Sequence, residues 1–171
     1  VNDAPTGTVT ISGTAEEDQT LTASNTLADE DGLGAISYQW QRDGADIAGA
    51  TGSSYTLSWA DVGANIRVVA SYTDSQGTFE SVTSGAIGAV TNVNDAPTGS
   101  VSIDNTIPAQ GDTLTASNTL ADLDGIPGPI TYQWFRDGAA IAGASGDTYT
   151  TVQADVGATL SVTASYTDGQ G

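Results

Sequence analysis

Aspartate and asparagine side chains recur at equivalent positions in the two halves of this chain. A D-x-D-G motif occupies residues 29–32 and returns at residues 122–125. Carboxylate and amide oxygens are the ligands that Ca²⁺ prefers, so a set of them converging from separate loops would form a calcium site. The candidate ligands of this set are Asn2, Asp3, Asp29, Asp31 and Asp74 in the first half and Asn94, Asp95, Asp122, Asp124 and Asp168 in the second.

The segments that must position these residues occur twice in the chain, because the sequence contains an internal repeat. Residues 1–7, with the sequence V-N-D-A-P-T-G, return as residues 93–99. The offset between matching residues is 92 to 94 along the chain, which is longer than the ~20–50 residues of a solenoid unit and suits a whole small domain. We therefore expect two domains, residues 1–92 and residues 93–171. The second copy has no counterpart of residues 78–90, so we expect it to lack its last strand.

The hydrophobic pattern predicts an all-β fold. Residues 65–73 alternate between apolar and polar side chains, which is typical of a half-buried strand. Asp43 and Gly44 separate two short runs and predict a tight hairpin turn. Trp40, on the third expected strand, is predicted to pack in the core of an immunoglobulin-like (Ig-like) sandwich. Strands of the first copy are expected at residues 7–12, 19–25, 35–42, 54–57, 65–73 and 78–91.

A second acidic group is expected at the opposite end of the first domain. If the domains stack end to end, this group faces the D-x-D-G loop of the second domain across the linker. Like-charged carboxylates ~5–6 Å apart cost on the order of 1 kcal/mol per contact. One Ca²⁺, with ~6–8 oxygen ligands, would relieve that repulsion. The additional candidate ligands are Glu16, Glu17, Asp61 and Asn92.

Turn formation is the alternative explanation of the same residues. Asp and Asn side chains bond the neighbouring backbone and stabilise turns without any metal. Asp61 lies at a corner where an aspartate often caps a turn. The recurrence of the whole acidic set in both copies favours calcium over turn formation alone.

The composition restricts the function further. The chain has 17 Asp and 4 Glu against 3 Arg, with no Lys, His or Cys, and its net charge is −18. An acidic surface repels nucleic acid and anionic membranes, so neither is expected as a partner. Without His, Cys or Lys, an enzyme would have only carboxylate pairs available. Acids that recur at turns suit a structural module better, and we expect no enzymatic activity.

These residues carry a resemblance to known repeats. The acids after Ala15, the D-x-D-G motif and the I-x-Y of residues 36–38 resemble the calcium-binding framework of cadherin-type repeats. The whole unit, and V-N-D-A-P-T-G above all, resembles the Ig-like or cadherin-like repeats of giant bacterial surface adhesins of the repeats-in-toxin (RTX) type. The resemblance implies a protein secreted to the bacterial cell surface, with repeats joined into a stalk by calcium at their junctions. The residues that match best are Asn94, Asp95, Asp122, Asp124 and Asp168, and Glu16 and Glu17 match less closely.

Together, these patterns predict two tandem Ig-like, cadherin-like β-sandwiches in an end-to-end rod. The expected function is that of a structural extender of a surface adhesin, rigidified by Ca²⁺ at the inter-repeat junction. Its expected partners are neighbouring repeats of the same chain, and it is expected to be monomeric. The alternative function is a glycan- or protein-binding adhesion module. Trp59 is its best candidate residue, because the equivalent position in the second copy is Gln153.

Overall fold

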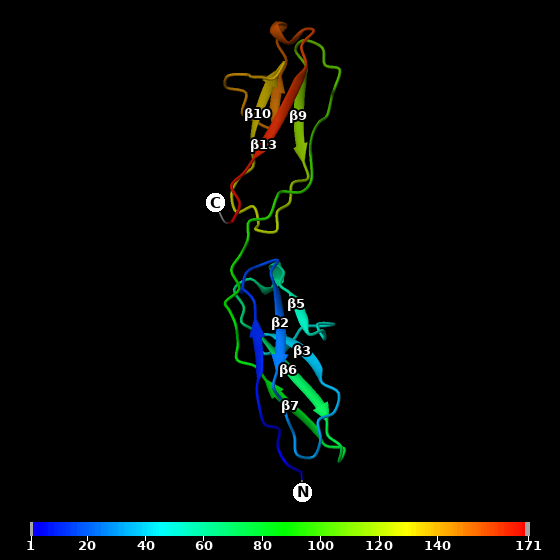
Figure 1. Cartoon of the computed structure of the whole chain (residues 1–171). Helices are drawn as coiled ribbons and strands as arrows, with labels where there is room; N and C mark the ends of the chain where they lie inside the picture. Colours follow the sequence, from blue (N-terminus) through cyan, green and yellow to red (C-terminus); the bar gives the residue numbers. More distant parts are fainter. Residues whose placement is uncertain (1, 170–171) are drawn as a thin grey trace. The chain divides into compact units, whose positions relative to one another are not determined.

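The computed structural model describes residues 2–169, and the chain divides into two compact units, Val1–Val93 and Asn94–Gly171. The expected boundary, between residues 92 and 93, lies one residue from this division. The protein is all-β, with four small antiparallel sheets, two in each unit (Figure 1). In the described part of the chain, no helix is long and apolar enough to cross a membrane.

Unit 1 is a sandwich of a three-stranded and a four-stranded sheet. Its elements are β1 (Val9–Ser12), β2 (Thr20–Asn25), β3 (Ser37–Arg42), β4 (Ala45–Asp46), β5 (Ser54–Thr56), the 3-10 turn η1 (Trp59–Asp61), β6 (Ile66–Thr73) and β7 (Phe79–Thr83). The sheets have the orders β1–β2–β5 and β4–β3–β6–β7. This arrangement is consistent with an Ig-like sandwich.

The core of unit 1 lies between these sheets because apolar side chains alternate along the strands. Ile66, Val68 and Ala70 of β6 are fully buried, and they share one cluster with Trp40 of β3. The indole Nε1–H of Trp40 donates to the carbonyl of Gly52 (2.9 Å), so its only polar atom is paired. The prediction that Trp40 packs in the core is therefore confirmed.

The predicted hairpin turn is also confirmed. Asp43 and Gly44 connect β3 to β4 and both have positive φ, 46° and 89°. Two positive φ angles are those of a type I′ turn, whose twist matches that of the flanking strands. The same turn recurs in unit 2, at Asp137 and Gly138 (φ 48° and 82°).

The prediction of one continuous strand over residues 78–91 is wrong. After β7 ends, residues 84–91, here named the closing segment, form only isolated bridges, antiparallel at Ile87 and parallel at Val90 and Thr91. The reason lies at Gly88, between these bridges. There φ is 148°, and a Cβ would lie 2.8 Å from a backbone carbonyl oxygen of a neighbouring loop. Glycine allows this close crossing, which a regular strand does not make.

Unit 2 repeats the architecture with fewer described strands. Its elements are β8 (Val101–Ile103), β9 (Thr113–Asn118), β10 (Thr131–Arg136), β11 (Ala139–Ala140), β12 (Thr148–Thr150), η2 (Gln153–Asp155) and β13 (Leu160–Ser165). The sheets have the orders β8–β9–β12 and β11–β10–β13, so β13 is an edge strand within the described residues. Trp134 of β10 is fully buried in the core, as Trp40 is in unit 1.

Candidate cation site at the acidic pole of each unit

The loop between β2 and β3 brings Asp29 and Asp31 beside the start of unit 1. The Asp31 N–H donates to Oδ1 of Asp29 (2.8 Å), and the Asp3 N–H donates to Oδ2 of Asp31 (2.6 Å). The side-chain amide of Gln76, from the loop after β6, donates to the other carboxylate oxygen of Asp31. Three segments distant in the sequence therefore meet here. We name Asp3, Asp29, Asp31 and Asp74 the acidic pole of unit 1.

Asp74 is the most unusual carboxylate of this pole. It lies just after β6 and is only 6% exposed. Its Oδ1 accepts the backbone N–H groups of Gln76 (2.8 Å) and Thr78 (2.7 Å). Its Oδ2 is buried and accepts no hydrogen bond from the described residues. An unpaired carboxylate oxygen out of water is costly, and a bound cation would remove that cost.

Tyr72 lies close to the negative charges of the same pole. Its hydroxyl donates to Oδ2 of Asp29 (2.6 Å). Burial raises the pKa of Tyr72, and the hydrogen bond to Asp29 and the charges of Asp29, Glu80 and Asp74 raise it further. The candidate Asn2 makes a separate contact, because its side-chain amide donates to Oε1 of Glu80 (2.8 Å).

The equivalent pole of unit 2 has the same loop geometry. The Asp124 N–H donates to Oδ1 of Asp122 (2.9 Å), and the Asp95 N–H donates to Oδ2 of Asp124 (2.7 Å). Asn94, Asp95, Asp122 and Asp168 line one shallow hollow of about 290 Å³. The structure thus brings the five ligands predicted for the second repeat together. We name Asp95, Asp122, Asp124 and Asp168 the acidic pole of unit 2.

Tyr166 occupies the position of Tyr72 in unit 2. Its hydroxyl donates to Oδ2 of Asp122. That hydrogen bond, together with burial and the charges of Asp122, Asp168 and Asp124, raises the pKa of Tyr166 to about 12. Both poles are therefore strongly negative, and in each a tyrosine hydroxyl holds the first aspartate of the D-x-D-G motif.

Glu16, Glu17 and Asn92 gather at the other end of unit 1. Glu17 is 4% exposed, and its Oε2 accepts the N–H of Val93 (3.3 Å). Its own N–H donates to the carbonyl of Thr91 (2.9 Å), and Glu16 forms a bridge with Thr91. The side-chain amide of Asn92 donates to the carbonyl of Val93 (3.1 Å). The loop of the two glutamates thus packs on the last residues of the unit.

Asp61, also predicted as a ligand, has a different role in the structure. It is fully buried, and its Oδ1 pairs with the guanidinium of Arg42 (2.7 Å). Its Oδ2 accepts hydrogen bonds from the Tyr55 hydroxyl (2.9 Å) and the Ser58 N–H (2.9 Å). Because both oxygens are engaged inside unit 1, we do not carry Asp61 into the candidate site.

Sequence reasoning missed this cluster, although the repeat contains its signal. In unit 2, Asp155 pairs in the same way with Arg136 (2.6 Å) and the Tyr149 hydroxyl (2.8 Å). Arg42 and Arg136 are two of only three arginines in the chain, and each follows the core tryptophan of its repeat by two residues. An arginine that recurs at this position in an otherwise acidic chain indicates that it pairs with an acidic residue at an equivalent position in each repeat.

The buried Asp61 predicts how stability depends on pH. Burial alone would raise its pKa, but the hydrogen bonds from Ser58, Arg42 and Tyr55 outweigh burial and hold the pKa below its ordinary value. A carboxyl with a depressed folded pKa stabilises the fold fully above its unfolded pKa of ~3.9. That stabilisation is lost as the pH falls through the folded value.

We therefore expect the urea midpoint of unit 1 to be steady from about pH 7 to 5 and to fall below about pH 4. Asp61→Asn, which cannot ionise, should show a shallower fall, measured by urea unfolding at a series of pH values. Asp46→Asn, at an exposed position, is the matched control and should follow the parent chain. Identical pH profiles for Asp61→Asn and the parent would contradict the prediction.

Hydrogen bonds within each pole explain the positions of some of its carboxylates without a metal. Among the described residues, no group of three or more acidic side chains is already arranged to hold a metal ion. The contacts from Asp31 to Asp29 and from Asp124 to Asp122 are those of Asx turns, the alternative that the sequence left open. The buried Oδ2 of Asp74 is the feature that turn formation does not explain.

The two units define the class of the protein, which is an all-β chain of tandem sandwiches consistent with Ig-like domains. No family model matches the sequence, and no curated protein matches it. Among solved structures, the chain is similar to the three N-terminal domains of the bacteriophage RB49 Highly Immunogenic Outer Capsid protein (Hoc), with a TM-score of 0.36 and 16% identity. The match covers 93% of this chain and 58% of that chain, less than two thirds of its length.

Proposed function

We propose that the chain is a structural spacer of a secreted bacterial cell-surface protein, and that its repeats bind Ca²⁺ at their acidic poles. The observation that supports a cation is the buried Oδ2 of Asp74, which accepts no hydrogen bond from the described residues. The loop that follows Asp74 bonds to Asp31 through the Ser75 N–H (3.2 Å) and the side-chain amide of Gln76. The donors are all oxygen atoms, and the chain has no Cys or His to favour a softer metal.

The residues of each pole would have different roles in binding the ion. Asp74 lies just after β6 and Asp168 lies in the segment that follows β13, and the D-x-D-G loops supply further carboxylates. Bound Ca²⁺ supplies positive charge that offsets the repulsion among these groups. Tyr72 and Tyr166 keep one oxygen of Asp29 and of Asp122 oriented, since their raised pKa values leave both hydroxyls protonated donors at neutral pH.

The proposed consequence is mechanical. Residues 91–99 contain Gly and Pro and connect one repeat to the next, and a flexible chain extends only as the square root of its length. Calcium bound at the acidic pole that follows this linker, with Asn94 and Asp95 among its ligands, would limit the motion of neighbouring repeats. A stalk of such repeats projects a distant tip from the cell surface, and its partners are the adjacent repeats.

Small-angle scattering tests this proposal on the whole chain. In millimolar Ca²⁺ we expect a sharply defined maximum dimension, and in chelator a broader distribution. The double variant Asp122→Ala with Asp124→Ala should give the chelated profile even when Ca²⁺ is present. In 1 mM Ca²⁺, binding should also raise the stability of the parent chain by about 0.4–1.4 kcal/mol per site, for a Kd of ~10⁻⁴–10⁻³ M.

The matched control removes the same charge elsewhere. Asp46→Ala with Asp147→Ala changes two exposed aspartates outside the poles, and this variant should respond to Ca²⁺ as the parent does. If the parent gives the same scattering curve and the same melting temperature in calcium and in chelator, the cation part of the proposal is wrong.

A second candidate function is ligand binding through Trp59. This residue lies on η1 and is 49% exposed, and an exposed indole can stack on a sugar ring. The test is a glycan and protein panel with the parent chain and Trp59→Ala. A specific ligand whose binding disappears in Trp59→Ala would replace the spacer with an adhesion module. No binding by either chain would favour the spacer.

A further inference from the structure

The segment that connects the two units, residues 91–99, is bonded to one unit or the other over most of its length. In unit 2, the Thr98 N–H donates to the carbonyl of Ala121 (2.8 Å), and the Ala121 N–H donates to the carbonyl of Thr98 (3.1 Å). Gly99 has a φ of 94°, and a Cβ there would lie 2.2 Å from the carbonyl oxygen of Thr119. This glycine therefore serves close packing against the end of β9, not flexibility.

Asp95 is the point from which unit 2 holds the chain. Its N–H donates to Oδ2 of Asp124 (2.7 Å), and Asp3 makes the same contact with Asp31 in unit 1 (2.6 Å). Pro97 has a fixed φ and restricts the residue before it to extended conformations. From Asp95 onward the chain is thus part of unit 2, in a geometry that occurs in both repeats.

Glu17 holds the other side of the connection within unit 1. Its backbone N–H donates to the carbonyl of Thr91 (2.9 Å), and its carboxylate Oε2 accepts the N–H of Val93 (3.3 Å). The side-chain amide of Asn92 donates to the carbonyl of Val93 (3.1 Å). Both backbone groups of Val93 are therefore bonded inside unit 1, and Glu17 holds the segment at two positions.

The burial of Glu17 supports a specific role for its carboxylate. The residue is only 4% exposed, although a buried carboxylate is costly unless it is hydrogen-bonded. The donor to this carboxylate in the described structure is the Val93 N–H, which belongs to the connecting segment. The side chain that costs most to bury at this end of unit 1 is thus the one that bonds to the connection.

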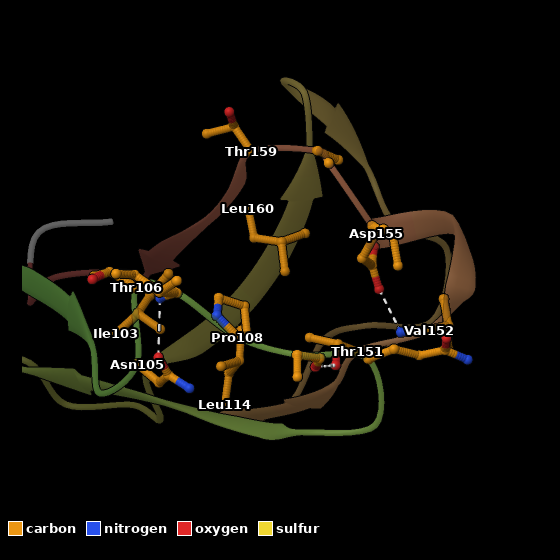
Figure 2. Close-up of a pocket in the computed structure, with 16 residues that line it drawn as sticks. Ile103, Asn105, Thr106, Pro108, Leu114, Thr151, Val152, Asp155, Thr159 and Leu160 are labelled. Carbon is orange, nitrogen blue, oxygen red and sulfur yellow. Dashed lines mark hydrogen bonds between the residues drawn. The ribbon is translucent and has the colours of Figure 1, made fainter.

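The equivalent loop of unit 2 is held in place without a glutamate. The offset of 93 places Gln110 where unit 1 has Glu17. That loop contains Pro108, and a hydrogen bond from the Thr151 hydroxyl to the carbonyl of Ala109 (2.7 Å) holds it (Figure 2). The sandwich therefore does not require a carboxylate at this position.

We propose that Glu17 is a positioning residue that limits the joint between the repeats to Asn94, without a metal. With Val93 and Asp95 each bonded within its own unit, the backbone freedom between them is that of φ and ψ of Asn94. A free chain of nine residues, the length of residues 91–99, would fluctuate around an end-to-end distance of ~15–18 Å. The proposal deepens the spacer function, on which its role in the protein rests, but its contacts contain no cation.

NMR relaxation of the full chain in chelator tests the role of Glu17. In the parent chain, the backbone order parameter of Val93 should be close to ~0.85, the value of rigid backbone. In Glu17→Ala, which loses the acceptor, it should fall below ~0.6. Glu17→Gln keeps an amide oxygen as acceptor and should behave as the parent does. Glu16→Ala removes the same charge one residue away and is the matched control.

Small-angle scattering in the same buffer gives an independent measurement. Insertion of two glycines between Asn94 and Asp95 lengthens the joint and leaves the contacts within each unit in place. We expect a broader distance distribution for this chain than for the parent. The insertion also keeps the proposal testable if Glu17→Ala lowers the stability of unit 1.

Three outcomes would overturn the proposal. One is an order parameter below ~0.6 for Val93 in the parent chain. Another is an unchanged order parameter in a folded Glu17→Ala, or equal scattering by the parent and the insertion chain. The third is an equal loss in Glu17→Gln and Glu17→Ala, which would assign the effect to the charge and not to the hydrogen bond. Because every sample here lacks calcium, these results are independent of the comparison between calcium and chelator that tests the cation.

Discussion

Replacing Asp61 with alanine is expected to lower the free energy of unfolding of unit 1 by about 3 kcal/mol. The Ser58 N–H, the Tyr55 hydroxyl and the Arg42 guanidinium all lose their acceptor. Each lost hydrogen bond of this kind costs on the order of 1 kcal/mol, which adds up to about 3 kcal/mol for the three donors. Arg42 is a third exposed and regains part of its solvation from water, which limits the loss.

Urea unfolding in calcium and in chelator measures this effect and separates two roles of Asp61. A structural aspartate destabilises unit 1 equally in both conditions when it is removed. A calcium ligand would show its loss mainly when calcium is present. The exposed Asp46→Ala is the control, with an expected change within about 0.5 kcal/mol. A loss confined to the calcium-containing samples would restore Asp61 to the metal site.

The case of Asp61 shows which part of a site a sequence can predict. The D-x-D-G loops and the Asn-Asp segments are local patterns, and the structure brings Asp95, Asp122 and Asp168 to one hollow in unit 2. Whether a given carboxylate is free for a ligand depends on partners far along the chain. Arg42 lies 19 residues from Asp61, and no local pattern connects them.

The fold could be predicted where one physical cause dominates. The alternation of apolar and polar residues predicted the strand at residues 65–73, which the structure gives as Ile66–Thr73. The Asp43–Gly44 pair predicted the turn between β3 and β4. The irregular path of the closing segment could not be predicted, because its run of small and apolar residues is equally compatible with a regular strand. Its path is decided at Gly88 by close contact with a neighbouring loop, which is a tertiary effect.

Unit 2 is expected to unfold before unit 1, by a margin of about 5 kcal/mol in the free energy of unfolding. In unit 1, Val82, Ile87 and Val90 pack against the core and help to bury the inner face of β6. Full burial of an aliphatic side chain contributes ~1.5–3 kcal/mol; Val90 is fully buried, and Val82 and Ile87 are partly buried. The described residues of unit 2 contain no such cover, and Leu160 and Val162 of β13 are only partly buried. Calorimetry of the whole chain should therefore show two transitions.

Hydrogen exchange assigns those transitions to the units. The Ile66 N–H donates to the carbonyl of Ile87 (2.8 Å) and should exchange only on unfolding of unit 1. The Leu160 N–H, at the equivalent position on the open edge of β13, should exchange orders of magnitude faster, since no strand covers it in the described structure. If Leu160 is as protected as Ile66 in the monomeric chain, then β13 is already covered, and the expected stability difference is wrong.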